Sequence, residues 1–206
     1  MDSMTIYSLP SWIAVGVNCV FGVYVLKKDY KSPVNRLFFL FLLGLITWSF
    51  GWAMMLNEGV KEKALFWAKF ACFGLSLCPA IYLHLTFLFP VRKIYSLKNY
   101  PLILAYLVGV AFLSVSFSGF LLKDVKWLAD FGIYTCEFGI LYPLYIGFYT
   151  ICFCWGILNL IRSLKEARSN REQLQSKYLI CGIIILFILS FISDISSFSL
   201  KYPFSS

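Results

Sequence analysis

Three side chains with ionisable groups stand within otherwise apolar stretches of the chain: Lys69, His84 and Asp194. Ionisable groups in such surroundings are costly, and they mark ligand or proton sites by default. Lys69 and Asp194 carry opposite charges and fall at similar depths, so we expect them to approach each other near one end of the molecule. His84 stands near the other end, where it could contact a ligand, transfer a proton or hydrogen-bond a neighbouring helix.

Aromatic and amide side chains offer a second kind of chemistry, which is the binding of an apolar or flat ligand. Trp48 and Trp52 are four residues apart and share one helix face, and Trp67 follows in the next apolar run. The three rings predict an aromatic pocket, while the alternative is a belt of tryptophans at headgroup level. Asn18 interrupts the first apolar run, where it suits a hydrogen bond between helices.

The seven cysteines predict neither a disulfide framework nor a metal site. Six of them lie inside apolar runs, and Cys152 and Cys154 point to different faces of one helix. We expect Cys136 to be an exposed thiol in a loop without a partner. The chain also lacks a Gly-rich phosphate loop, a Ser/His/Asp set and paired carboxylates. No catalytic residue, metal or cofactor is therefore predicted.

Composition defines the elements that position these residues. Of the 206 residues, 60% are hydrophobic and 14% are charged, whereas soluble domains carry about 25% charged residues. A water-soluble fold is excluded, and the absence of period-two alternation excludes a membrane barrel. The chain predicts an all-α, polytopic transmembrane bundle that forms a single membrane domain over residues 1–206, without a soluble domain. The six predicted spans are residues 9–26, 37–56, 64–89, 102–122, 140–161 and 179–200.

Basic residues predict the orientation of the bundle. The first, third and fifth connections hold twelve lysines and arginines, and the other connections and the C-terminal end hold five, together with acidic residues. The positive-inside rule places the N-terminus outside and, after six crossings, the C-terminus outside as well. The net charge of +8 is explained by this topology and by anionic lipid headgroups, so no nucleic-acid partner is needed. We expect a multi-pass protein of the cell membrane, and its immediate partner is the lipid bilayer that surrounds it.

Two connections are long enough to have structure of their own. The fourth, residues 123–139, is expected to lie on the membrane surface or to cap the bundle. The fifth, residues 162–178, is polar and contains neither proline nor glycine, so it predicts a helix that projects from the fifth span into the cytoplasm.

Three local patterns suggest a family. Lys-Ser-Pro-Val-Asn-Arg occupies residues 31–36, Phe-Trp-Ala-Lys occupies residues 66–69 ahead of Pro79, and Leu-His-Leu-Thr-Phe-Leu-Phe-Pro follows at residues 83–90. The fifth connection reads Ser-Asn-Arg-Glu-Gln-Leu at residues 169–174. From about Asn18 onward, this succession resembles the seven-helix membrane region at the N-terminus of bacterial and archaeal sensor histidine kinases.

The resemblance implies an external N-terminus, seven helices and a cytoplasmic kinase or other output domain. This sequence shows six spans, no phosphoacceptor histidine in a soluble helix and no ATP-binding segment, so it does not predict an enzyme. We expect either a truncated sensor or a stand-alone relative that pairs with another membrane protein. A kinase or other signalling subunit and a second copy of the chain stay open as partners, and the signal ligand is not identified.

The sequence therefore predicts a membrane-embedded sensory input module. Its ligand pocket is assigned to Trp48, Trp52, Trp67, Lys69 and Asp194, with Asn18 and His84 as intramembrane polar residues and His84 on the transmission side. A small transporter or permease-like subunit is the alternative, which requires broken spans with polar groups near the midplane. A structural assembly partner without a ligand is the third possibility.

Overall fold

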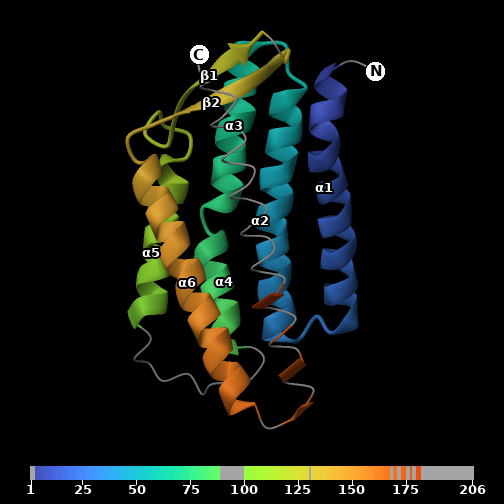
Figure 1. The fold of residues 1–206 in the computed structure, drawn as a ribbon, viewed down its shortest axis with the longest axis vertical. Coiled ribbons are helices and arrows are strands. Elements are labelled where there is room, and N and C mark those ends of the chain that lie inside the picture. Colours follow the sequence, from blue (N-terminus) through green and yellow to red (C-terminus); the bar gives the residue numbers. More distant parts are fainter. Residues whose placement is uncertain are drawn as a thin grey trace, which may run out of the picture.

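The fold is a bundle of membrane-type helices with a β-hairpin across one end (Figure 1). It was established from a computed structural model that describes residues 3–88, 100–129, 131–167, 169–170, 173–174, 177 and 180–181. The elements in chain order are α1 (Ser3–Lys28), α2 (Pro33–Leu56), α3 (Lys61–Leu75), α4 (Cys78–Leu88), α5 (Tyr100–Val115), β1 (Leu122–Leu128), β2 (Ile133–Phe138) and α6 (Tyr142–Glu166).

Four helical segments of the described chain are long and apolar enough to cross a membrane. They are Tyr7–Lys28, Pro33–Leu56, Lys61–Leu88 and Tyr142–Glu166, and Tyr100–Val115 is a shorter apolar helix. The helices confirm a helical membrane protein, and four of the predicted spans coincide with the long segments, whereas the predicted fourth span overlaps the shorter helix. The sixth predicted span, residues 179–200, lies almost entirely outside the described residues.

The fourth predicted span ends earlier than expected. Residues 102–122 were expected to form one helix, but α5 stops at Val115. The Ser116 amide bonds to the carbonyl of Leu113, and its hydroxyl bonds to the carbonyl of Phe112, so the chain tightens into a turn. Ser118 and Gly119 follow, and the residues up to Leu122 lead into the hairpin rather than into the span.

The third span is broken in the middle. α3 ends at Leu75 and α4 begins at Cys78, so the run that composition predicts as one helix forms two. Pro79 has no amide hydrogen to donate to the carbonyl of Leu75, which removes one bond of the helical ladder. The Ser76 hydroxyl bonds to the Cys72 carbonyl at 2.8 Å and contacts the Ser116 hydroxyl at 3.1 Å. These bonds satisfy polar groups where the helix is interrupted.

The hairpin corrects the expectation of an all-α chain. β1 and β2 pair antiparallel from Leu122 opposite Phe138 to Leu128 opposite Ile133, and Gly132 has a φ of 63° in the turn. β2 begins with isoleucine, tyrosine and threonine, and β1 contains Val125 and Trp127, all of which favour a pleated surface. A bulge after Leu122 shifts the alternation, so that Leu122 and Val125 both face the helices.

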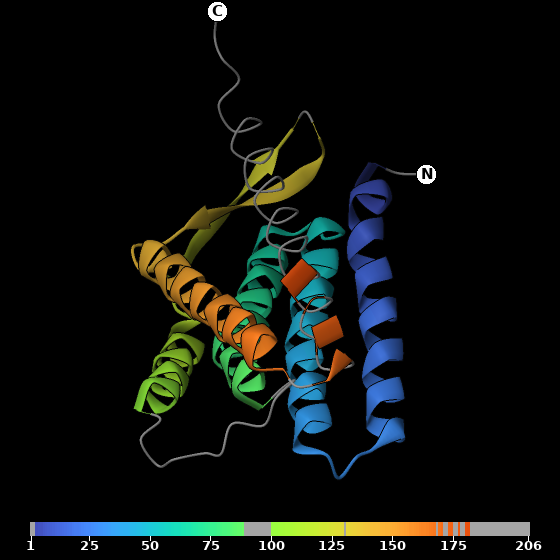
Figure 2. The same cartoon turned by 60° about the horizontal axis from the view of Figure 1, so that its bottom comes forward.

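The elements are arranged around the third span. α1 stands at the edge of the bundle beside α2, and α5 and α6 stand on the other side of α4 (Figure 2). The outer core joins α2 and α3 to the hairpin through Met55, Ala64, Ala68, Leu122, Val125, Tyr134 and Cys136. A separate core joins α4, α5 and α6 through Ala80, Leu83, Leu102, Ala105 and Cys152. The two halves of the broken span therefore belong to different cores.

Small residues let α2 approach the third span closely. A Cβ atom at Gly51 would lie 2.8 Å from the backbone nitrogen of Ala71 and from the carbonyl oxygen of Trp67. A Cβ atom at Gly74 would lie 2.5 Å from Cβ of Thr47. Small residues at such contacts are typical of membrane helices, whose association depends on packing rather than on the hydrophobic effect.

The close contact between α2 and α3 predicts that one added methyl group has a large effect on stability. Gly51→Ala should destabilise the protein by about 1–3 kcal/mol, because the new Cβ meets backbone atoms that cannot rotate away. The matched control is Gly16→Ala on α1, where nothing lies within 4 Å of the added atom. Thermal unfolding of the two variants in the same detergent measures the difference. Equal unfolding temperatures would show that α2 and α3 are not in close contact.

Candidate functional site

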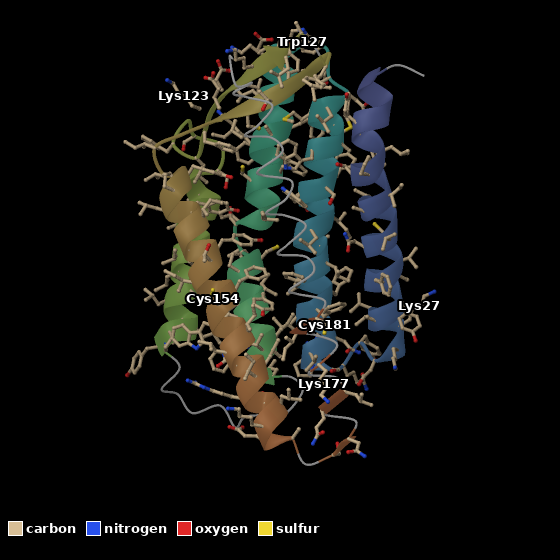
Figure 3. The ribbon with its side chains drawn as sticks, viewed as in Figure 1. Lys27, Lys123, Trp127, Cys154, Lys177 and Cys181 are labelled. Carbon is tan, nitrogen blue, oxygen red and sulfur yellow. The ribbon has the colours of Figure 1, made fainter. Side chains whose placement is uncertain are left out.

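The hairpin end of the molecule holds most of the predicted site. It comprises the hairpin, the start of α1, the end of α2 and the start of α3, and the opposite end comprises the α1–α2 turn and the end of α6 (Figure 1). Lys123 and Trp127 mark the hairpin end, and Lys27 and Lys177 mark the opposite end (Figure 3). All three predicted tryptophans lie on the helices that reach the hairpin end.

The structure brings Trp48 and Trp52 together in one cleft and places Trp67 in another. The first cleft has a volume of about 220 Å³ and lies between α1 and α2. Its walls are Pro10, Ser11, Ala14, Trp48, Ser49 and Trp52. The second cleft has a volume of about 470 Å³ and lies where α2 turns into α3, lined by Met54, Glu58, Glu62, Lys63, Phe66 and Trp67.

The predicted aromatic set is joined by a residue that the sequence gave no reason to single out. Phe50 lies between the α1 and α3 tryptophans, with ring centroids 5.6 Å from Trp12 and 5.5 Å from Trp67, both nearly perpendicular. Edge-to-face pairs at this distance are favourable. Near the same end, the Ser8 hydroxyl donates a hydrogen bond to the side-chain oxygen of Asn57 at 3.1 Å. These contacts tie α1 to α2 beside the two clefts.

The ionisable residues are placed as follows. Lys69 is half-buried on α3, and within the described ranges it forms no ion pair. Asp194 lies outside the described residues, so the expected pair stays a prediction. His84 Nδ1 is 2.9 Å from the Tyr106 hydroxyl, and the rings are nearly perpendicular, which joins α4 to α5. Asn18 is half-buried on α1, where no hydrogen bond from its side chain to another described residue is present.

The hairpin caps the outer core, as one of the two expectations for the fourth connection stated. An ion pair fixes it to the start of α3, since Lys61 Nζ lies 2.6 Å from the Asp124 carboxylate. The Lys61 hydrogen bond, helped by the Val125 amide, holds the pKa of the Asp124 carboxyl below its usual range. Both side chains are partly exposed, so the pair fixes position more than it adds stability.

Cys136 corrects a further expectation. The thiol was expected to be exposed in a loop, but the residue is only 4% exposed and lies on β2 opposite Val125. Its sulfur is 3.7 Å from the Met55 sulfur, inside the outer core. The reason is the strand, since alternate residues of β2 face the helices and Cys136 shares that face with Tyr134. In the described part of the chain, no group of histidine, cysteine and acidic residues could hold a metal ion.

The fold and these clefts define a polytopic helical membrane protein with a hairpin across one end of the bundle. A family model for the N-terminal 7TM region of histidine kinase matches residues 10–204, which is nearly the whole chain. The chain belongs to this family and is an integral membrane protein of the sensor class, which confirms the resemblance. No curated protein matches the chain.

Docking of the hairpin can be tested through the buried thiol. Val125→Asp places a carboxylate at a position that is 1% exposed and should undock the hairpin, because a buried unpaired charge is costly. Labelling of Cys136 by a polar maleimide should then accelerate by at least about tenfold. Lys126→Asp is the matched control, because it adds the same carboxylate at the next position of the strand, where the side chain is exposed. Equal labelling rates in both variants would show that the hairpin does not protect the thiol.

Proposed function

We propose that the chain is the sensory input module of a histidine-kinase-type signalling system, with its hairpin end outside the cell membrane. A signal at the outer end displaces the third span, and the displacement reaches the cytoplasmic ends of the helices. The observation that carries this proposal is the division of the third span, because its two halves belong to different cores. α3 carries the hairpin, whereas α4 carries α5 and α6. A signal acts by favouring one of two arrangements of such elements.

Charge supports the orientation. The end opposite the hairpin holds seven described basic residues against the acidic Asp29 and Glu166, so it suits the cytoplasmic side. Those basic residues are Lys27, Lys28, Lys31, Arg36, Arg162, Lys165 and Lys177. At the hairpin end, four lysines face four acidic residues, which gives no net positive charge. We propose one membrane domain over residues 1–206 with six spans, an external N-terminus and residues 179–200 as the sixth span.

The proposal also assigns a signalling partner and a ligand pocket. A kinase or another signalling subunit receives the displacement at the cytoplasmic face, and a second copy of the chain is the alternative partner. Trp48 and Trp52 line the site between α1 and α2, and Trp67 lines the site between α2 and α3. Lys69 and Asp194 pair near the outer leaflet. His84 links α4 to α5 on the transmission side through Tyr106.

A transporter is the second candidate, and one observation favours it. The interruption of the third span at Ser76 and Leu77, with the Ser76 and Ser116 hydroxyls in contact, is the arrangement expected of a broken helix at a substrate site. Both hydroxyls are fully buried, however, and each also bonds to a carbonyl of its own helix. Hydroxyls whose hydrogen bonds are already formed within the protein suit a hinge better than they suit a substrate site.

The orientation predicts which positions react from outside. In a variant whose exposed Cys19, Cys154 and Cys181 are replaced by alanine, Lys126→Cys should be labelled in intact cells by a maleimide that cannot cross membranes. Lys31→Cys, at the α1–α2 turn, should react only after the cells are opened. Both side chains are exposed, so access to the reagent decides the result. The opposite pattern would reverse the orientation.

If the break at Ser76 and Leu77 acts as a hinge, a change at the hairpin should alter the opposite end of the bundle. Val125→Asp should raise hydrogen exchange in the last turn of α6, residues 162–166, by severalfold, because the hairpin and α3 shift against α4. Pro79→Ala restores an amide donor for the Leu75 carbonyl and makes the span continuous, so it should reduce this response by at least half. Exchange is measured by mass spectrometry on protein in nanodiscs.

Pro143→Ala, in the first turn of α6, is the matched control and should leave the response unchanged. A response of the same size in the Pro79→Ala variant would remove the hinge from the proposal. The transporter would instead be supported if proteoliposomes showed a tracer flux and the Pro79→Ala substitution abolished that flux.

A further inference from the structure

The larger cleft is widely open to its surroundings and has the volume of a small-molecule site. Its volume of about 470 Å³ falls within the range of roughly 300–1,000 Å³ that is typical of ligand pockets. It lies at the hairpin end, between the last turn of α2, the turn that follows and the first two turns of α3. Its lining combines two aromatic rings, one methionine, two carboxylates and one ammonium group.

The aromatic wall is held in place by neighbouring rings. Phe66 and Trp67 lie with ring centroids 5.2 Å apart and nearly perpendicular planes. Trp67 is also packed against Phe50 and Phe70 at 5.5 and 5.7 Å, which restricts its rotation. Phe66 is 49% exposed and therefore accessible to a ligand. Rings fixed in this way can contact a cation without a large loss of side-chain freedom.

The carboxylates of the cleft have no ion-pair partners among the described residues. Of the two lysines that flank Glu62 in the chain, Lys61 is bound to Asp124 of the hairpin, whereas Lys63 lines the same cleft without a described ion pair. Glu58 and Glu62 take part in no described ion pair, so their charges stay available. Glu62 and Phe66 are four residues apart and share one face of α3, which places a carboxylate next to a ring. Lys63 also lines the cleft, yet the described cation–π contact is that of Lys31 with Tyr30, not of Lys63 with Trp67.

We propose that this cleft binds an organic cation, such as a quaternary ammonium or alkylammonium group. The rings and methionine surround its apolar substituents, and Glu58 and Glu62 balance its charge. The cleft holds two carboxylates against one ammonium group, so its net charge favours a cation over an anion. The same chemistry is available from a soluble cation and from the headgroup of a zwitterionic lipid. The inference deepens the proposed sensory function and rests on it only for the cleft's external position and for the role of the cation as a signal.

Binding is tested on the full chain in nanodiscs of phosphatidylglycerol by calorimetric titration with choline and with 3,3-dimethylbutanol, its neutral isostere. Choline should bind at least about tenfold more tightly than the isostere, and added salt should weaken its binding. Glu62→Gln, Glu58→Gln and Phe66→Leu should each lower the affinity for choline by about five- to tenfold. Phe66 and Glu62 are exposed, and unfolding temperatures verify that these variants fold.

The matched controls are Glu137→Gln and Phe120→Leu, which change a carboxylate and an exposed ring outside the cleft and should leave the affinity unchanged. Weaker choline binding in nanodiscs with phosphatidylethanolamine or phosphatidylcholine would assign the site to a lipid headgroup. Unchanged binding would assign it to a soluble cation. Equal affinity for the isostere, no binding in any nanodisc, or wild-type affinity in the cleft variants would overturn the inference. Signalling does not enter this measurement, so its outcome is separate from the tests of orientation and coupling.

Discussion

The close contact of α2 with the third span is the interaction on which the rest of the structure depends. α1 packs mainly on α2, the hairpin packs on α3, and α5 and α6 pack on α4. Each of these elements is therefore positioned through the pair that meets at Gly44, Gly51 and Gly74. Within a lipid environment the apolar surfaces of helices gain little by meeting, so complementary shape has to hold this pair together. Small residues supply that shape, because they leave the backbones free to approach.

The interruption of the third span gives this central pair its asymmetry. α2 is continuous and contacts both α3 and α4, whereas the span beside it is divided at Ser76 and Leu77. A helix that loses one ladder bond next to a continuous partner can bend there at low cost, provided that its polar groups stay bonded. The bonds of Ser76 to Cys72 and Ser116 meet this condition. The signal that we propose thus shifts the outer core with its hairpin against the core of α4, α5 and α6.

Much of this arrangement follows from the sequence, and the rest depends on contacts between distant segments. Hydropathy predicts the spans because a bilayer requires long apolar runs. It does not predict the hairpin, whose strands are short and become stable only by packing on Met55 and Ala64. The burial of Cys136 follows from that packing. Helix spacing predicts that Trp48 and Trp52 share one face, and both line one cleft, but spacing does not show which neighbour Trp67 faces. Glu58 and Glu62 entered the sequence reasoning only as loop charges, since their proximity to rings depends on the turn between α2 and α3.

The interface between α4 and α6 holds polar groups whose bonding is incomplete. The Asn159 amide on α6 reaches the Thr86 hydroxyl on α4 at a long 3.4 Å, and the buried Tyr82 and Ser163 hydroxyls have no partner among the described residues. Gly156 leaves room for the Tyr82 ring, so α4 and α6 approach closely despite these polar atoms. Unpaired polar groups in an apolar interface cost free energy, and an arrangement that satisfied them would compete with the present one. The displacement that we propose would therefore act on an α4–α6 interface whose Tyr82 and Ser163 hydroxyls have no described partners.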